Sequence, residues 1–278
     1  MFQVVVLGSG QDGASPQLGI ESGRGPDRTA SSLAVVAGDG TCALFDASPD
    51  LRVQQRHLFD LPGYRTSRRR RFPVDAVFLT HAHMGHYAGL VHFGAEAAAA
   101  EGVPCWASSR MLDFLRTHEP WAQLFARGHL IGGRLDPGSK TSPVPGLEVA
   151  AVPVPHRDEL SDTVAFSIRV DDSQLLYLPD IDGWAEWAET DAVIARHDVA
   201  LIDGTFFSDD ELPDRPITSI AHPLILDSIE RFESLDTRVI FTHLNWSNPA
   251  ADPSGEAAGR VRAAGMEVAF DGMTIDLG

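Results

Sequence analysis

Three histidines lie within six residues, in the segment HAHMGH at residues 81–86. The apolar run at residues 77–79 precedes them and predicts a strand, so the histidines leave the end of a strand and enter a helix. His81 and His83 are two positions apart, and in an extended chain their side chains point the same way. Neutral imidazole is a common ligand of zinc and iron. The segment therefore predicts a transition-metal site that includes His81, His83 and His86.

Three further side chains of metal-binding type come directly after apolar runs that predict strands: His156, Asp180 and His243. Strand ends are where α/β sheets commonly build their sites. One such residue alone is more often structural. The ordered series along the chain indicates that these three side chains and the first three histidines form one site.

His222 opens a predicted helix, where it either orients a substrate or bends the chain. We take His222 and Asp180 as the candidate catalytic residues. The remaining histidines lie in helical or loop segments without partners of the same kind, and we expect them to be surface or packing residues: His57, His92, His118, His129 and His197.

The strands that must position these residues alternate with helices along the chain. Strands are predicted at residues 2–7, 32–36, 43–46, 76–80, 147–154, 164–170, 174–178, 199–202, 239–242 and 267–270, and helices at 49–58, 87–100, 110–116, 184–196, 224–235 and 254–264. Glycines and prolines between residues 132 and 146 predict a loop between two halves. Layer rules suggest sheets packed face to face with helices outside. No long linker separates the halves, so we predict a single domain over residues 1–278.

A glycine-rich segment follows the first predicted strand, at residues 7–13. Its glycines have the spacing that dinucleotide-binding folds use, at Gly8, Gly10 and Gly13. Such a site needs a helix N-terminus to hold the pyrophosphate, and no helical pattern follows here. The segment is therefore predicted to be a loop at the end of a sheet.

The composition narrows the class of partner. The net charge is −17, from 22 basic and 39 acidic residues, and such a surface repels nucleic-acid backbones. The run of four arginines at residues 68–71 is predicted to be a solvated loop.

No apolar run approaches the roughly 18–20 residues of a membrane span, so we expect no membrane partner and a cytoplasmic protein. The two cysteines, Cys42 and Cys105, are expected to be buried free thiols. A homodimer is compatible with the sequence.

The order of these ligand types resembles the metallo-β-lactamase superfamily, whose pattern is HxHxDH followed by His, Asp and His. The segments LFDASPD at residues 44–50 and THLNWSNP at residues 242–249 look like the coenzyme PQQ synthesis protein B group, as do residues 7–9, 15–17, 203–211 and 264–273. The resemblance implies an α/β fold, a four-layer αββα sandwich of two mixed sheets flanked by helices. It also implies that a first metal is held by His81, His83 and His156, that a second is held by His86 and His243, and that Asp180 bridges the two.

The sequence departs from these families at three places. The aspartate of HxHxDH falls at Gly85, which favours one metal rather than two unless Asp46 or Asp203 substitutes. The cysteine-rich motif of the PQQ synthesis protein B group is absent from residues 20–31. The first two histidines of the metal motif, which that group tends to replace by acidic residues, are kept. These departures predict a divergent member.

Three functions follow as hypotheses. The first is a hydrolase that acts on a small-molecule ester, amide or phosphodiester through a metal-activated water, with zinc as the expected divalent metal. The second, implied by the resemblance, is an iron-dependent oxygenase or hydroxylase that acts on a peptide-derived or small aromatic substrate in cofactor or natural-product biosynthesis. Manganese is a further alternative to zinc. The third is a non-catalytic metal-binding protein or scaffold.

Overall fold

The structure is a computed structural model that describes residues 2–62, 64, 73–211 and 221–277. The four-arginine run at residues 68–71 lies outside the described residues. Two seven-stranded sheets form the centre. The first sheet has the order β14 (Thr274–Ile275), β1 (Phe2–Gly8), β2 (Ser32–Ala37), β3 (Cys42–Phe45), β4 (Ala76–Phe78), β5 (Val103–Ala107) and β6 (Leu130–Arg134). The second has the order β13 (Glu267–Val268), β12 (Arg238–Thr242), β11 (Val199–Asp203), β10 (Ser173–Leu178), β9 (Val164–Val170), β8 (Leu147–Pro153) and β7 (Lys140–Val144).

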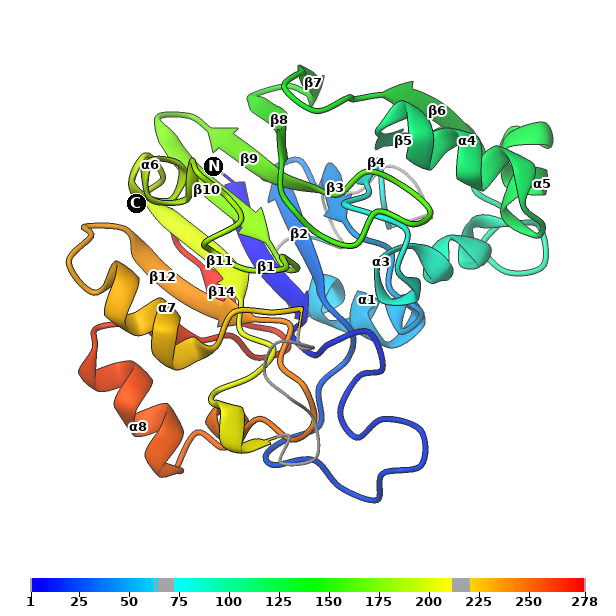
Figure 1. The fold of residues 1–278 in the computed structure, drawn as a ribbon. Coiled ribbons are helices and arrows are strands. Elements are labelled where there is room, and N and C mark those ends of the chain that lie inside the picture. The colour runs from blue at the N-terminus through cyan, green and yellow to red at the C-terminus, as the bar shows by residue number, and fades with distance from the viewer. Residues whose placement is uncertain (1, 63, 65–72, 212–220, 278) are drawn as a thin grey trace.

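Helices cover the outer face of each sheet. The first sheet is covered by α1 (Leu51–Asp60), α3 (Met84–Tyr87), the 3₁₀ helix η1 (Ala88–Phe93), α4 (Ser109–Thr117) and α5 (Trp121–Ala126). The second sheet is covered by α6 (Thr190–Ala195), α7 (Ile225–Phe232) and α8 (Glu256–Ala263). Figure 1 shows α4 and α5 on one outer side of the molecule and α7 and α8 on the other. The predicted four-layer αββα sandwich of two mixed sheets is therefore confirmed.

Strand β1 shows how the sequence builds these layers. Its side chains alternate, so that Val4 and Val6 face the second sheet and Val5 and Leu7 face the helices. The core between the sheets is aromatic at its centre, where the Phe45 and Phe78 rings stack with centroids 4.8 Å apart. Both cysteines are buried thiols, as predicted. Among the described residues, no helix has the length and apolar character needed to cross a membrane.

The strand directions bring the polar strand ends to one place. In the first sheet, β3 and β4 are parallel, and β1 runs the same way because it is antiparallel to β2, which is antiparallel to β3. In the second sheet, β8 and β10 are both antiparallel to β9, and β10, β11 and β12 are parallel. The carboxyl ends of the strands in each set therefore meet at one edge of their sheet.

Several predicted elements are wrong in extent. The helix predicted at residues 87–100 is the short α3 followed by η1, which ends at Phe93, and the helix predicted at 184–196 is confined to α6. Strands β5, β6, β7 and β14 and helix α5 were not predicted. Gly132 and Gly133 belong to β6 rather than to a loop. A Cβ atom at Gly133 would lie 2.6 Å from the Trp106 ring, so glycine is required there by close packing, not by a turn.

Candidate metal centre

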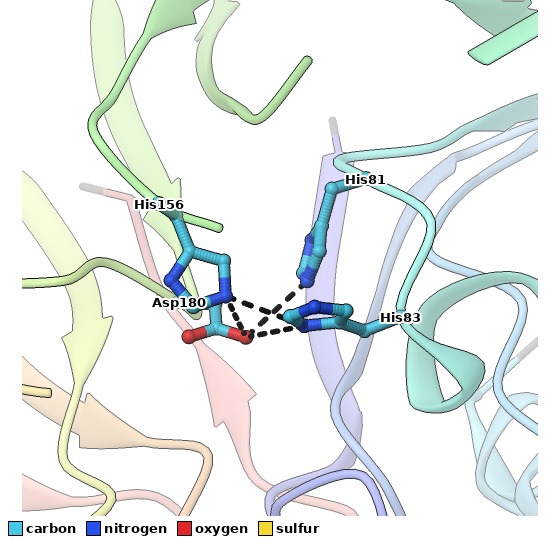
Figure 2. Close-up of side chains that lie close together, drawn as sticks. All are labelled: His81, His83, His156 and Asp180. Carbon is cyan, nitrogen blue, oxygen red and sulfur yellow. Dashed lines mark hydrogen bonds and ion pairs between the residues drawn. The ribbon is translucent and has the colours of Figure 1, made fainter. Parts of the chain in front are cut away.

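Four side chains converge at the edge of the two sheets to form a first cluster (Figure 2). Asp180 Oδ2 lies 3.3 Å from His81 Nε2, 3.7 Å from His83 Nδ1 and 3.2 Å from His156 Nε2. His156 Nε2 lies 3.3 Å from His83 Nδ1. Ligands bound to zinc in a tetrahedron, at about 2.0–2.2 Å from the ion, are about 3.3–3.6 Å apart. The spacing in this cluster therefore fits one divalent ion.

A second cluster lies on the other side of Asp180 and contains Asp12, His86 and His243. One ligand atom from each of these three residues lies within 4.8 Å of the others. Asp180 Oδ2 is 3.9 Å from His86 Nε2 and 3.8 Å from His243 Nε2. The same carboxylate oxygen thus lies between the two clusters, and all six side chains that the sequence predicted as ligands come together.

The histidine rings are oriented by partners on their outer sides. His86 Nδ1 lies 2.7 Å from Asp46 Oδ2, and His156 Nδ1 lies 2.9 Å from Asp182 Oδ1. The Nδ1 atoms of His81 and His243 contact threonine hydroxyls, at 3.0 Å from Thr80 and 2.9 Å from Thr205. Metal-binding histidines commonly hold their second nitrogen in this way. The contacts turn the Nε2 atoms toward the centre.

The inward-facing atoms lack hydrogen-bond partners. The Nε2 atoms of His81, His86 and His243 and the Oδ1 atom of Asp180 are buried and make no hydrogen bond within the part of the chain that the structure describes. Leaving a buried polar atom unpaired costs about 1–3 kcal/mol each. A divalent metal ion satisfies such atoms, so the donor set fits the metal that the sequence predicts.

Two backbone positions at the centre are unusual. Asp46 and His243 adopt left-handed backbone conformations, with φ angles of 61° and 63°. Residues with a Cβ atom rarely take this conformation, which glycine adopts without steric strain. The backbone is therefore strained at one predicted ligand and at the carboxylate that orients another.

The protonation of the cluster follows from burial and charge. Burial lowers the pKa of His81 and of His243 and so favours the neutral imidazole that binds metals. Burial opposes the charged form of His86, but the Asp46 and Asp12 carboxylates outweigh burial and raise its pKa well above the ordinary value. Burial raises the pKa of Asp180, but His243 and His222 outweigh it and hold that pKa well below the ordinary value.

His222 lies at the rim of the clusters. Its Nδ1 atom is 2.8 Å from Asp203 Oδ2 and 3.3 Å from Asp180 Oδ1. Its side chain is 14% exposed, whereas that of Asp180 is 2% exposed. Burial lowers the pKa of His222, but the Asp203 and Asp180 carboxylates outweigh burial and raise it to about 9. The ring therefore lies where a substrate could contact it.

Of the two carboxylates that we considered as substitutes for the missing aspartate, Asp203 belongs to a third group of possible ligands, with Asp180, His222 and His243, whose ligand atoms lie within 4.8 Å of one another. Asp46 accepts hydrogen bonds from the Thr80 amide and hydroxyl in addition to its contact with His86. Asp203 accepts from the Thr205 amide and hydroxyl and from the Ile181 amide, and it contacts His222. Both orient histidine rings.

Asp12 is the residue that the sequence analysis missed. It lies in the glycine-rich loop after β1, and its Oδ1 atom accepts a hydrogen bond of 3.1 Å from the Gly85 amide. Burial raises the pKa of Asp12, but the neighbouring His86 and His243 outweigh burial and hold it well below the ordinary value. Asp12 lies further into a loop after its strand than Asp180 does, so the strand-end signal that identified Asp180 does not identify Asp12.

Comparisons with known proteins agree with this geometry. The family model described as "Beta-lactamase superfamily domain" matches residues 41–244. The coenzyme PQQ synthesis protein B of Xanthomonas oryzae pv. oryzae is 30% identical, over 99% of this chain and 100% of the relative. The chain belongs to the beta-lactamase superfamily, in the coenzyme PQQ synthesis protein B group. Both resemblances seen in the sequence are thereby confirmed.

Solved structures of the superfamily share the fold. The crystal structure of zinc-bound PqqB from Methylobacterium extorquens matches with a TM-score of 0.84 and 26% identity, and the match covers 100% of each chain. A diphosphatase from the PhnP family matches with a TM-score of 0.72 and 20% identity, over 99% of this chain and 96% of that one. With the clustered donors, the zinc-bound relative supports a divalent metal in this superfamily member.

Metal removal is expected to lower stability without unfolding the chain. A ligand present at about 1,000 times its dissociation constant stabilises by about 4 kcal/mol, which corresponds to a fall in Tm of about 8–16 °C when it is removed. The sheets and their three apolar cores do not depend on the ion. Chelation should therefore lower the Tm and leave the far-UV circular dichroism in place, and added zinc should restore the Tm. Loss of the far-UV signal on chelation would show instead that the metal is required for folding.

Proposed function

We propose that this protein is a metal-dependent hydrolase that acts on a small-molecule ester, amide or phosphodiester. The observation that carries the proposal is the His222–Asp203 pair at the rim of the clustered ligands, with His222 Nδ1 held 2.8 Å from Asp203 Oδ2. A ligand cluster alone suits storage or structure as well as catalysis. A histidine whose orientation is fixed beside the cluster adds a group that can transfer a proton to or from a substrate.

Each part of the site has a role in this proposal. When bound, a divalent metal would lower the pKa of a water molecule toward about 7. The metal would also polarise the bond to be cleaved. Imidazole ligands carry no negative charge, so a divalent ion held by His81, His83 and His156 beside Asp180 would retain positive charge and favour an anionic substrate group. Asp203 occupies Nδ1 of His222, which leaves Nε2 as the ring atom available to donate a proton to the leaving group.

The similarity to coenzyme PQQ synthesis protein B over nearly the whole chain supports a biosynthetic setting with a small or peptide-derived substrate. The chain's acidic charge disfavours nucleic acid as a substrate. Zinc is the metal we propose, because the first cluster offers three imidazoles and a carboxylate at tetrahedral spacing.

A second candidate function is an iron-dependent oxygenase. The second cluster consists of two histidines and one carboxylate, His86, His243 and Asp12. That ligand set is typical of non-haem iron enzymes that activate dioxygen. The two candidates differ in the metal they need and in whether they consume oxygen.

The test compares the protein loaded with zinc and with iron on three probes: bis-p-nitrophenyl phosphate, p-nitrophenyl acetate and a tyrosyl peptide, the last with an oxygen electrode. We expect zinc-dependent hydrolysis of an ester or phosphodiester that falls to background in the Asp180→Asn variant. Oxygen uptake that requires iron and the peptide, with no hydrolysis above the variant's level, would reject the hydrolase in favour of the oxygenase.

A further inference from the structure

The N-terminal loop reaches into the second ligand cluster at the position where the family's aspartate is missing. A Cβ atom built at Gly85 would lie 2.2 Å from Asp12 Oδ1 and 2.7 Å from Asp12 Cα. These distances are too short for two side chains to share the space. Asp12 therefore occupies the volume that a side chain at position 85 would need.

Glycine at position 85 is not required by the backbone. Gly85 lies in helix α3 and is not among the described glycines with positive φ. Its lack of a side chain is explained by the space that Asp12 takes, and not by a turn. The presence of aspartate at position 12 and of glycine at position 85 is thus one coupled feature of the structure.

The Asp12 carboxylate points at the unpaired atoms of the cluster. Its Oδ1 atom lies 3.4 Å from His86 Nε2, and the Gly85 amide donates to the same oxygen. The Nε2 atoms of His86 and His243 are buried without a hydrogen-bond partner among the described residues, and Asp180 Oδ2 lies 3.9 Å and 3.8 Å from them. Two imidazoles and two carboxylates therefore surround one position next to the first cluster.

The loop that carries Asp12 is fixed on both sides. The amide of Leu244, the residue after His243, donates to the Ser9 carbonyl, and the Gln11 amide donates to the Leu244 carbonyl, both at 2.9 Å. The Asp271 carboxylate accepts from the amide and hydroxyl of Ser9 and from those of Thr29. Asp12 is thus held in place before any ion arrives, and a preorganised ligand binds more tightly than a mobile one.

We propose that Asp12 is the metal ligand that replaces the aspartate missing at Gly85, so that the protein holds two metal ions and not one. The inference deepens the metal site on which the proposed hydrolase rests. It reverses our expectation of a mononuclear site, and it gives the N-terminal loop a direct role in the centre.

The experiment measures zinc per chain by elemental analysis after dialysis, and zinc affinity by titration against a competing chelator. The wild-type protein should hold two equivalents. Asp12→Asn should keep one tight equivalent and weaken the second by about 100-fold or more, since loss even of an outer partner commonly weakens a metal by about 10–100-fold. Glu21→Gln, in the same loop and exposed, removes the same charge and should bind as the wild type does.

A second substitution tests the coupling between the two positions. Gly85→Ala adds a Cβ atom that would lie 2.2 Å from Asp12 Oδ1 and 2.7 Å from Asp12 Cα, so it must displace Asp12 and should weaken the second equivalent without removing any ligand. A wild-type protein with only one equivalent, or an Asp12→Asn variant that holds two tightly, would overturn the inference. Both readouts are independent of turnover. A protein that binds two zinc ions through Asp12 but hydrolyses nothing would support this inference and reject the proposed function.

Discussion

Replacing both His81 and His83 by alanine is expected to leave the protein without metal in the first cluster and without hydrolytic activity. The two rings supply two of the three nitrogens that face Asp180 Oδ2, at 3.3 Å and 3.7 Å from that oxygen. A divalent transition metal left with one imidazole and one shared carboxylate is weakly held. Elemental analysis after dialysis should show the loss of this equivalent, and the far-UV circular dichroism should remain that of the wild type.

The matched control is the double variant His92→Ala with His118→Ala. It removes the same number of imidazoles from outside the two clusters. Its metal content and activity should equal those of the wild type. Full metal retention by the His81 and His83 double variant would contradict the assignment of the first cluster as a metal site.

The second large effect is expected at His222. Changing His222→Gln should lower kcat by about 10²–10⁴-fold for substrates with poor leaving groups, the usual contribution of a positioned general acid. One ligand atom of His222 lies within 4.8 Å of ligand atoms of Asp180, Asp203 and His243, so the metal content is measured beside kcat. We expect that content to be unchanged, because Asp203 holds Nδ1 of His222. The measurement is kcat for a series of esters or phosphodiesters whose leaving groups differ in pKa.

A proton donor and a structural residue predict different results in that series. If His222 donates a proton, the variant should lose little kcat on substrates with a good leaving group such as p-nitrophenolate. It should lose most on substrates with an alkoxide leaving group. The companion change Asp203→Asn, which removes the carboxylate that holds the His222 ring, should lower kcat by less. The loss should again be larger for poor leaving groups than for good ones. An equal loss for all leaving groups would show that His222 only shapes the site.

The six predicted ligands could be found from the sequence because each is local to a strand end. The histidines at 81–86 are close together in the chain, and His156, Asp180 and His243 each follow an apolar run. In a sheet whose strands share a direction, such positions meet at one edge. Asp46 and Asp203, the two carboxylates predicted as substitutes for the missing ligand, lie at strand ends as well.

Asp12 could not be found in that way, because the space at Gly85 is filled from 73 residues away in the chain. Its placement depends on the backbone contacts between the N-terminal loop and Leu244, which only the packed sheets create. The strands that were not predicted from the sequence were missed for a similar reason. Strands β5 and β7 contain prolines and β6 contains two glycines. Strands β6 and β7 lie at sheet edges, and in β5 Pro104 comes before the residues that pair with β4, positions that the sequence pattern does not show.

The left-handed backbone at His243 sets fold stability against the metal centre. A side chain in this conformation costs about 1 kcal/mol or more, and glycine relieves that cost. Asp46 shares the conformation, but its carboxylate accepts hydrogen bonds from the Thr80 amide and hydroxyl, and its loss would leave these buried groups unpaired. Random mutation followed by selection for thermal tolerance alone would therefore favour the loss of the His243 side chain. Lineages in which the chemistry is no longer needed should drift toward glycine at this position while they keep the sandwich. Glycine at position 243 would then identify a relative that has kept the fold and given up the centre.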